Sequence, residues 1–547
     1  MAFFRKKNLL LITTAILSCV YAVLYAGRGI DMTDAGLQLY LQKNAFSGSG
    51  DTWMTVPLTN FIGGAWLSLS PENISVLWSY LGGAVLYVII MLTSLKIYFY
   101  FFDEIDFKDW LLVIGIALFI PQRMAINYYT FPVMLSFVFF YVLLKSLKEN
   151  CRRDWFLLGI IGGVVVFSRF TFATILLIPF LLYHHREKSK RTLLYCGSGL
   201  STALIPLSIL FLIWKSQFPT SGSELTYANI IYRIKSFAHI GFPIWHVFSQ
   251  ACAIICLVLT VERIFSYKAQ KVIGRMFLLF TIFCASAMLV FYTAKDREWT
   301  SFFGAPPNTM LILYIIPSLL FVVLFFAVTD ESVTDIMIDK DIEKPYIISL
   351  CLFSLIIPLG SDVAYCKLGY MAPAYLMILG GCLLHRMKGE YPIRRCVFLA
   401  IISGGIVVRP LYSYLDAPVF RCNTMPSFSG LKYMYTTKKR ANDWEALLNA
   451  LSVHGNGEKE ILLAGYLNFG PLYLLNYQDW NHGVCTGGND FMKRFLKNSA
   501  SKPLPRIALA DENSAEFSQL KSFLIDRYER VFLMDRGFFN YSIWKIK

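Results

Sequence analysis

Charged side chains are scarce in this sequence. Asp, Glu, Lys and Arg together make up only 16% of its 547 residues, whereas hydrophobic residues make up 56%. The chain is long enough for several soluble domains, but so little charge argues against that organisation. Together with a mean hydropathy of +0.52 and many apolar runs of about 20 residues, the composition indicates a polytopic α-helical membrane protein.

The sequence also lacks the cysteine and histidine spacings of metal and redox sites. Its 12 cysteines include no CxxC pair, and its seven histidines show no zinc spacing. Most of the cysteines lie inside apolar segments, where cysteine packs as a small core residue. Only Cys422 and Cys485 share the polar C-terminal region, and a disulfide between them is left open. We expect no His/Cys metal site.

A compact basic patch is missing as well, although the net charge is +15. The Lys and Arg residues cluster instead in short loops between apolar spans, as the positive-inside rule requires. We therefore expect membrane lipids and no nucleic acid as partners, with some attraction to anionic lipid. The loops assigned to the inner side contain Lys145, Lys148, Arg152 and Arg153; Arg186, Lys188, Lys190 and Arg191; Arg263, Lys268, Lys271 and Arg275; and Arg386, Lys388, Arg394 and Arg395.

The apolar runs predict about thirteen spans. The first, Asn8 to Ala26, follows a basic start and has no clear cleavage site, so we expect an uncleaved span with its N-terminus inside. An odd number of spans places the C-terminus outside. The further spans are predicted at 75–98, 110–122, 128–146, 155–168, 170–183, 192–214, 245–261, 276–294, 308–329, 346–359, 370–385 and 396–414.

The sequence changes character after residue 414. Its apolar runs shorten to 460–464, 507–510 and 531–534, with helix-like stretches at 443–451 before the first run and at 514–527 before the last, and a closing strand at 541–544. Alternating short strands and helices predict a small α/β domain. We therefore divide the chain into a transmembrane domain, residues 1–414, and an extracytoplasmic α/β domain, residues 415–547.

The first outer loop, residues 28–72, carries two carboxylates three positions apart, Asp31 and Asp34. Apolar residues after Asp34 (Leu37, Leu39 and Tyr40) could hold this stretch on the membrane surface, and apolar patches at 61–69 suggest a second interfacial helix. Carboxylates here are either helix caps or catalytic groups, and Thr33 or Asp34 would serve as an N-cap.

Other charged and aromatic residues are predicted at the outer ends of spans. Because charge at membrane depth is costly, such residues generally face a polar cavity and tend to be functional. Arg169 interrupts an apolar stretch; its guanidinium offers a fork of donors to a phosphate, or else snorkels from a helix end. Solvated loop charges remain the alternative for Arg297 and Lys367. The remaining candidates on this side are Arg123, Tyr128 and Asp362, the last of which could pair with Lys367.

The pattern resembles the GT-C type glycosyltransferases, the polytopic class that includes protein mannosyltransferases and bacterial aminoarabinose transferases. The resemblance rests on Asp34 in the first outer loop, on Tyr128-Tyr129-Thr130-Phe131-Pro132, on Gly162-Gly163…Ser168-Arg169-Phe170, and on the layout of spans and C-terminal domain. Many members have Asp-Glu in the first loop, whereas Ala35 follows Asp34 here. This departure argues against a metal bound by the Asp-Glu pair, and Asp31 is the candidate to replace the missing Glu. A divalent metal ion is the one cofactor that the resemblance leaves open.

The resemblance implies an inverting transfer of sugar from a polyprenyl-phosphate donor, on the outer face of a bacterial plasma membrane. Asp34, with Asp31 as the second candidate, would be the general base. Arg169, Arg297 and Lys367 would bind the donor phosphate, and Arg123, Tyr128 and Asp362 would bind substrate. The acceptor is a lipid, a glycan or a protein of the cell envelope.

Two other functions remain as alternatives. A polysaccharide transporter would show matching halves and broken spans at corresponding positions, and we find neither. A polymerase or ligase of lipid-linked glycans shares much of the chemistry, but it would be expected to place arginines and a catalytic His or Glu in a large late outer loop. Here the longest early loop contains the Asp pair, which favours the transferase.

Overall fold

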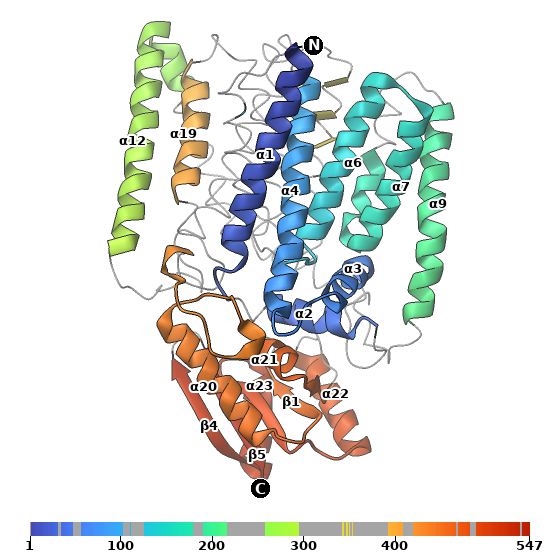
Figure 1. The fold of residues 1–547 in the computed structure, drawn as a ribbon, viewed down its shortest axis with the longest axis vertical. Coiled ribbons are helices and arrows are strands. Elements are labelled where there is room, and N and C mark those ends of the chain that lie inside the picture. Colours follow the sequence, from blue (N-terminus) through green and yellow to red (C-terminus); the bar gives the residue numbers. More distant parts are fainter. Residues whose placement is uncertain are drawn as a thin grey trace.

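The computed structural model of the chain is mostly helical (Figure 1). Long helices stand side by side, and a smaller α/β layer lies at the end opposite the N-terminus. The structure describes residues 2–30, 34–46, 56–101, 110, 125–178, 190–215, 258–294, 342–343, 346–347, 349–350, 353, 392–408, 419–465, 469–481, 488–536 and 539–547.

Among the residues that the structure describes, seven long helices form the upper part of the molecule. Five of them contain segments long and apolar enough to cross a membrane: Lys7–Ala26, Ser75–Phe101, Thr130–Glu149, Arg191–Lys215 and Tyr267–Ala287. All seven coincide with predicted spans. They are α1 (Ala2–Ala26), α4 (Ser75–Phe101), α6 (Thr130–Glu149), α7 (Arg152–Ser168), α9 (Lys190–Lys215), α12 (Tyr267–Ala294) and α19 (Pro392–Val408).

The remaining predicted spans are tested only in part. Those at 110–122, 245–261, 308–329, 346–359 and 370–385 lie wholly or largely outside the described residues. The span expected at 170–183 begins differently from the prediction, because Phe170–Leu176 forms a 3₁₀ helix, η1. This helix follows directly on Arg169, whose extended backbone ends α7.

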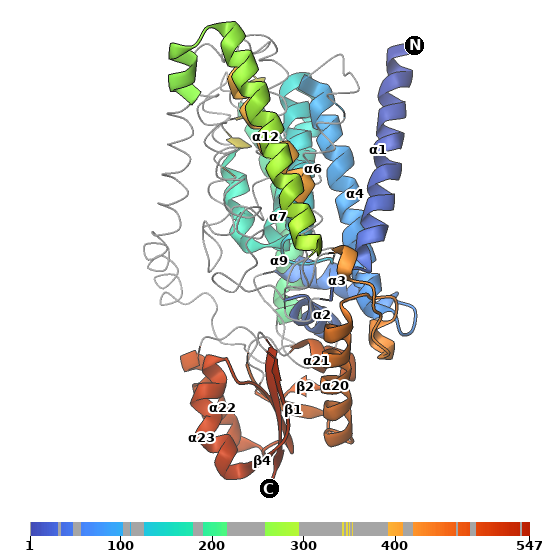
Figure 2. The ribbon, with the colours of Figure 1, turned by 90° about the vertical axis from the view of Figure 1, so that its left-hand side faces the viewer.

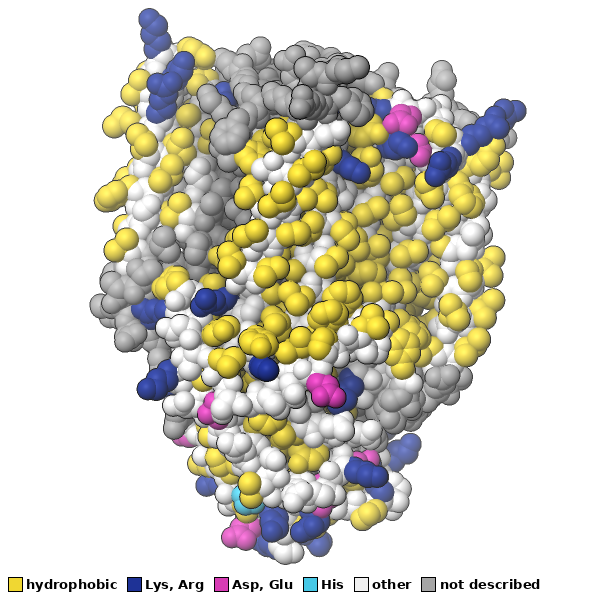
Figure 3. All heavy atoms as spheres, viewed as in Figure 1, with side chains coloured by type: hydrophobic (Ala, Val, Ile, Leu, Met, Phe, Trp, Pro, Cys, Tyr) yellow, Lys and Arg dark blue, Asp and Glu magenta, His cyan; other side chains and the backbone are white. Residues whose placement is uncertain are grey.

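Glycines let two of the long helices approach closely. A Cβ on Gly159 of α7 would lie 2.0 Å from the carbonyl oxygen of Cys196, and one on Gly199 of α9 would lie 2.0 Å from that of Phe156. Small residues at such contacts allow the backbones to pack without a hydrophobic driving force. Outward-facing apolar side chains form the belt seen in Figure 3, as lipid contact requires.

The two ends of the molecule carry different loops. The N-terminus, the turn between α6 and α7, and the start of α12 lie at one end, whereas the first outer loop and the C-terminal layer lie at the other (Figures 1 and 2). At the first end Lys145 pairs with Asp154 at 3.1 Å, and Arg394 pairs with Glu262 at 2.8 Å. Loops predicted on opposite sides of the membrane thus lie at opposite ends of the molecule, and which end faces outward stays a prediction.

The topology predicts opposite signals from two reporter fusions. A cytoplasm-active reporter placed after Lys190 should be active, and the same reporter after Lys547 should be silent, because the charge asymmetry of the loops places these positions on opposite sides. A periplasm-active reporter at both sites supplies the converse control. Equal signals at the two positions would overturn the placement of the first outer loop.

Two short helices lie between the long helices and the C-terminal layer. These are α2 (Asp34–Asn44) and α3 (Pro57–Ser68), the latter where an interfacial helix was predicted. The prediction for α2 was wrong in one respect: Leu37, Leu39 and Tyr40 do not face a membrane surface but are at most 2% exposed. They are buried because α3 packs on one side of α2 and α21 (Phe469–Leu475) on the other.

The C-terminal layer is a five-stranded mixed sheet with helices on both faces (Figure 2). Its strand order is β2-β1-β3-β5-β4; β1 pairs in parallel with β2 and β3, and the other pairs are antiparallel. The strands are β1 (Glu460–Ala464), β2 (Gln478–Asp479), β3 (Ile507–Asp511), β4 (Tyr528–Arg536) and β5 (Phe539–Ile546). The remaining helices are η6 (Val419–Arg421), η7 (Ser429–Leu431), α20 (Lys438–His454), α22 (Gly488–Ser501) and α23 (Ala515–Arg527).

Candidate functional site

Asp34 is the first residue of α2. The structure describes the backbone of Asp34 but not its side chain, and Asp31 lies outside the described residues. A helix N-terminus favours negative charge, because its first N–H groups have no partner within the helix.

Two buried glutamines fix α2 against α3 and against the segment that precedes α6. Gln38 donates from Nε2 to Oδ1 of Asn60 at 2.7 Å, and Gln42 donates from Nε2 to the carbonyl oxygen of Ile126 at 2.6 Å. Each is only 1% exposed. The two lie four residues apart, so they share one face of the helix. Gln42 also requires Gly63, where a Cβ would meet its side-chain amide at 2.2 Å.

The opposite side of α2 is held by the C-terminal layer. The backbone N–H of Asp479 donates to the hydroxyl of Tyr40 at 3.1 Å, and Nζ of Lys43 donates to Oδ1 of Asn476 at 2.7 Å. Burial lowers the pKa of Lys43. Gly36 and Gly470 bring the two backbones together, since a Cβ on Gly36 would lie 2.6 Å from Cα of Gly470. The helix that begins with Asp34 is thus clamped on two sides.

Arg169 is buried at the end of α7 among aromatic rings. It is 6% exposed, and its Nη1 donates to the carbonyl oxygen of Tyr128 at 3.1 Å. The guanidinium carbon lies 5.5 Å from the ring centre of Tyr128, 5.0 Å from that of Tyr129 and 5.9 Å from that of Phe172. A snorkelling arginine would expose its charged head, so this burial argues against that alternative.

The segment before α6 brings the tyrosines to Arg169. Oδ1 of Asn127 accepts hydrogen bonds from the backbone N–H groups of Tyr129 and Thr130, at 2.8 and 2.9 Å, and so holds the turn that leads into the helix. The carbonyl oxygen of Ser168 accepts from Oγ1 of Thr59 at 2.7 Å. The bond between Thr59 and Ser168 joins the end of α7 to α3.

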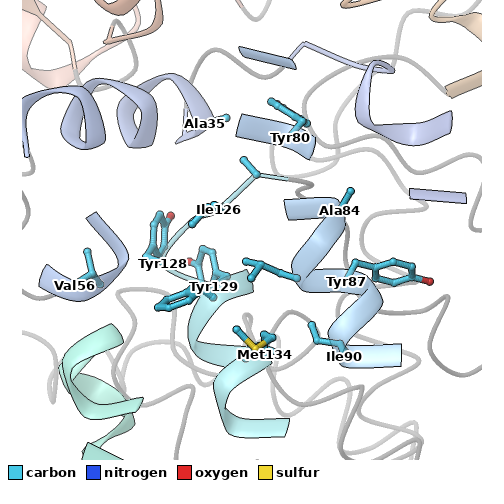
Figure 4. Close-up of a cluster of buried hydrophobic side chains, with 14 of the residues drawn as sticks. Ala35, Val56, Tyr80, Ala84, Tyr87, Ile90, Ile126, Tyr128, Tyr129 and Met134 are labelled. Carbon is cyan, nitrogen blue, oxygen red and sulfur yellow. The ribbon is translucent and has the colours of Figure 1, made fainter. Parts of the chain in front are cut away.

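These contacts gather three sequence features into one region. Figure 4 shows Ala35, the neighbour of Asp34, in the same buried cluster as Ile126, Tyr128 and Tyr129. The loop that contains Asp34, the start of α6 and the end of α7 therefore meet at the end of the long helices that faces the C-terminal layer. Sequence reasoning singled out Arg169 and Tyr128 but missed Gln38 and Gln42. Their spacing of four residues within an otherwise apolar stretch was the sequence signal that could have identified these two glutamines.

An apolar cleft of about 340 Å³ lies beside this region. It opens between the C-terminal end of α2, α3, the end of α7 and the end of α9. Phe167, which lines it, is two residues before Arg169. The other lining residues are also apolar: Ala45, Phe46, Pro57, Leu58, Phe61, Leu207, Leu210, Phe211, Ile213 and Trp214. Trp214 closes one side by donating from Nε1 to the carbonyl oxygen of Ala45 at 2.7 Å.

Five predicted site residues are not placed. Arg123, Arg297, Asp362 and Lys367 lie, like Asp31, outside the described residues, and their roles stay predictions. Among the side chains that the structure describes, no three His, Cys, Asp or Glu residues come together as a metal site would require.

Of the comparisons with known proteins, only the comparison with solved structures gives a match. No protein-family model matches this chain, and no curated protein is similar to it in sequence. Among solved structures, the chain is similar to ArnT from Cupriavidus metallidurans in the apo state, over 98% of this chain and 97% of that one. The TM-score is 0.45 and the sequence identity is 10%.

Proposed function

We propose that this protein is a membrane glycosyltransferase of the GT-C type. It transfers a glycosyl residue from a polyprenyl-phosphate sugar to a lipid, glycan or protein acceptor of the cell envelope, on the outer face of a bacterial plasma membrane. The observation that carries the proposal is Arg169, a buried cation at the end of α7 in the region where the Asp34 helix is clamped. A buried cation at membrane depth is costly, and a phosphate is the ligand that its fork of donors fits.

The reaction needs a base on one side of the sugar and a cation on the other. The acceptor hydroxyl oxygen forms a bond to the anomeric carbon while the bond from that carbon to the phosphate oxygen breaks. The hydroxyl proton passes to the carboxylate of Asp34, and the negative charge on the leaving polyprenyl phosphate is stabilised by Arg169. Attack opposite the leaving group inverts the anomeric configuration.

The other predicted residues take supporting roles in this proposal. Arg297 and Lys367 add positive charge at the phosphate, Arg123, Tyr128 and Asp362 contact the substrates, and Asp31 is the alternative base. The proposed mechanism uses no metal ion, because Ala35 occupies the position at which a second carboxylate would complete an Asp-Glu pair with Asp34. The same proposal includes about thirteen membrane spans. It also includes a separate extracytoplasmic domain that begins at residue 415.

The apolar cleft supports a lipid-linked donor. Its lining is made of apolar side chains, and Phe167 connects it to Arg169 along the chain. Isoprenoid units are apolar and would gain by leaving water for such a lining. Several exposed apolar residues of α9, among them Leu210 and Ile213, lie at the rim, where a lipid would enter from the bilayer.

Arg169→Lys tests the proposal. Lysine keeps the charge but loses the planar fork, so the purified variant should bind polyprenyl-phosphate sugar about 10- to 100-fold more weakly, because hydrogen bonds to charged groups contribute about 1.5–3 kcal/mol. Arg152→Lys is the matched control, since Arg152 also faces a ring, that of Tyr195 at 5.7 Å, at the other end of α7. Unchanged donor binding by Arg169→Lys would show that the guanidinium only packs against the tyrosines.

A further inference from the structure

One segment outside the candidate site is bonded to the end of the first span. We name residues 419–437, which precede α20, the collar segment. Tyr435 donates from its backbone N–H to the carbonyl oxygen of Gly27 at 2.7 Å and accepts from the N–H of Gly29 at 2.8 Å. Arg28 donates from Nη1 to the carbonyl oxygen of Cys422, and its guanidinium lies 5.3 Å from the ring centre of Tyr435.

These bonds fix the depth of the collar segment. The apolar segment Lys7–Ala26 of α1 has 20 residues, and at about 1.5 Å per residue it spans roughly the 30 Å of a hydrocarbon core. Its last turns expose Val23 at 58% and Leu24 at 65%, as contact with lipid requires. Residues 27–29 therefore lie at the level of the lipid headgroups, and the collar segment that is bonded to them lies there too.

The collar segment turns apolar side chains both inward and outward. Cys422, Leu431 and Met434 are completely buried. Phe420 and Tyr433, by contrast, are 42% and 48% exposed, and Met425 is 43% exposed. These three exposed side chains are not part of the buried core. A tyrosine exposed at this depth, such as Tyr433, is typical of the interfacial belts of membrane proteins.

Tyr433 is held outward by an unusual backbone. Its φ is +65°, a left-handed conformation that is rare for a bulky residue and often marks a functional position. Its N–H donates to Sδ of Met425 at 3.2 Å, so these two exposed residues are neighbours. Gly27 permits the arrangement, because a Cβ there would lie 2.8 Å from the carbonyl oxygen of Tyr433.

Exposed cations lie within the collar segment and directly beside it in the sequence and at the end of α1. Arg28, Lys432, Lys438 and Lys439 are all exposed, and Nζ of Lys432 lies 5.1 Å from the ring centre of Tyr433. The nearby carboxylate of Glu445 accepts a hydrogen bond from the N–H of Ser427. Figure 3 shows Lys and Arg side chains along the border of the apolar belt at this end. Such a surface is complementary in charge to anionic headgroups.

We infer that the collar segment is a binding surface for anionic phospholipid in the outer headgroup layer. Phe420, Met425 and Tyr433 insert beside α1, and Arg28, Lys432 and Lys438 face the headgroup phosphates. The surface anchors the C-terminal layer to the bilayer next to the first span. This inference depends on α1 crossing the membrane and is independent of the proposed transferase activity.

Photo-crosslinking of the full-length protein in nanodiscs tests the inference. Benzoyl-phenylalanine replaces Phe420 or Tyr433, and mass spectrometry detects phospholipid adducts after irradiation. Val20, exposed on α1, is the positive control. Val453 is the negative control, because it is 72% exposed but lies about 24 Å along α20 from its N-cap Thr437, at about 1.5 Å per residue. We expect adducts at positions 420, 433 and 20 and none at 453.

A second experiment tests the preference of the collar segment for anionic phospholipid. In nanodiscs that mix phosphatidylcholine with phosphatidylglycerol, adducts at position 433 should contain more phosphatidylglycerol than its share of the lipid. Lys432→Gln with Lys438→Gln should abolish that enrichment while adducts to phosphatidylcholine persist. Absence of lipid adducts at 420 and 433, with position 20 labelled, would overturn the surface. Crosslinks to a second copy of the chain would do the same, and adducts without enrichment would overturn its preference for anionic lipid.

Discussion

Asp34→Asn should insert and purify normally, bind the donor lipid, and transfer sugar about 10²–10⁴-fold more slowly than the parent, the usual cost of removing a general base. Asparagine keeps the size and most of the hydrogen bonding of aspartate but cannot accept the acceptor's proton. If Asp34 only stabilised the start of α2, its loss would cost about 1 kcal/mol of stability and leave the transfer rate nearly intact. Transfer by the purified variant, measured beside its thermal stability, separates the two roles.

Asp31→Asn is the matched control for Asp34→Asn. Asp31 directly follows the residues that end the first span, whereas Asp34 begins the clamped helix α2. Asp31→Asn should therefore retain much more activity. Near-parental transfer by Asp34→Asn, or a loss that is accounted for by unfolding, would retire its assignment as the base. A large loss from Asp31→Asn alone would transfer the role to Asp31.

Gly36→Ala should both loosen the C-terminal layer and reduce transfer. The new Cβ would lie 2.6 Å from Cα and 2.8 Å from N of Gly470, and backbone atoms cannot move aside as a side-chain end can. Overpacking of this kind costs about 1–3 kcal/mol, which exceeds or offsets the roughly 1 kcal/mol that alanine gains in a helix. Because Asp34 lies two residues away, and a displacement of about 1 Å can cost about 10²-fold in rate, we expect a loss of that size with donor binding less affected.

Gly197→Ala is the control for that change. Gly197 lies in α9, and a Cβ there would meet nothing within 4 Å, so this variant should keep the parental transfer rate and be as stable as the parent or up to about 1 kcal/mol more stable. The measurements are thermal unfolding in detergent or nanodiscs and steady-state transfer. Parental values for Gly36→Ala would mean that the contact between α2 and α21 does not position Asp34.

Burial of α2 is the point at which sequence reasoning failed for a physical reason. In Leu37-Gln38-Leu39-Tyr40-Leu41-Gln42 the apolar residues form no single stripe. A one-sided stripe would mark a helix on a surface, whereas this helix is covered by α3 on one side and by α21 on the other. The same crowding explains Gln38 and Gln42, whose amides satisfy buried partners on other segments.

Hydropathy and charge along the chain by themselves determined most of the helical layout. The spans corresponding to α1, α4, α6, α7, α9, α12 and α19 were found because a segment in lipid must be apolar along its own length and must satisfy its backbone hydrogen bonds within itself. Both conditions are local. The short apolar runs predicted the strands β1 and β3 in the same way, because each strand buries both faces.

Only the tertiary structure decided how the candidate site is assembled. Gln42 meets Ile126 across 84 positions of sequence, and Tyr40 meets Asp479 across 439. Arg169 owes its burial to tyrosines that precede α6. No local sequence pattern predicts these contacts between distant residues. Each contact depends on how closely two backbone segments can approach, and on which polar group is buried away from water when they do. The charged candidate residues could be predicted from the sequence, whereas the segments that surround them are determined by tertiary packing.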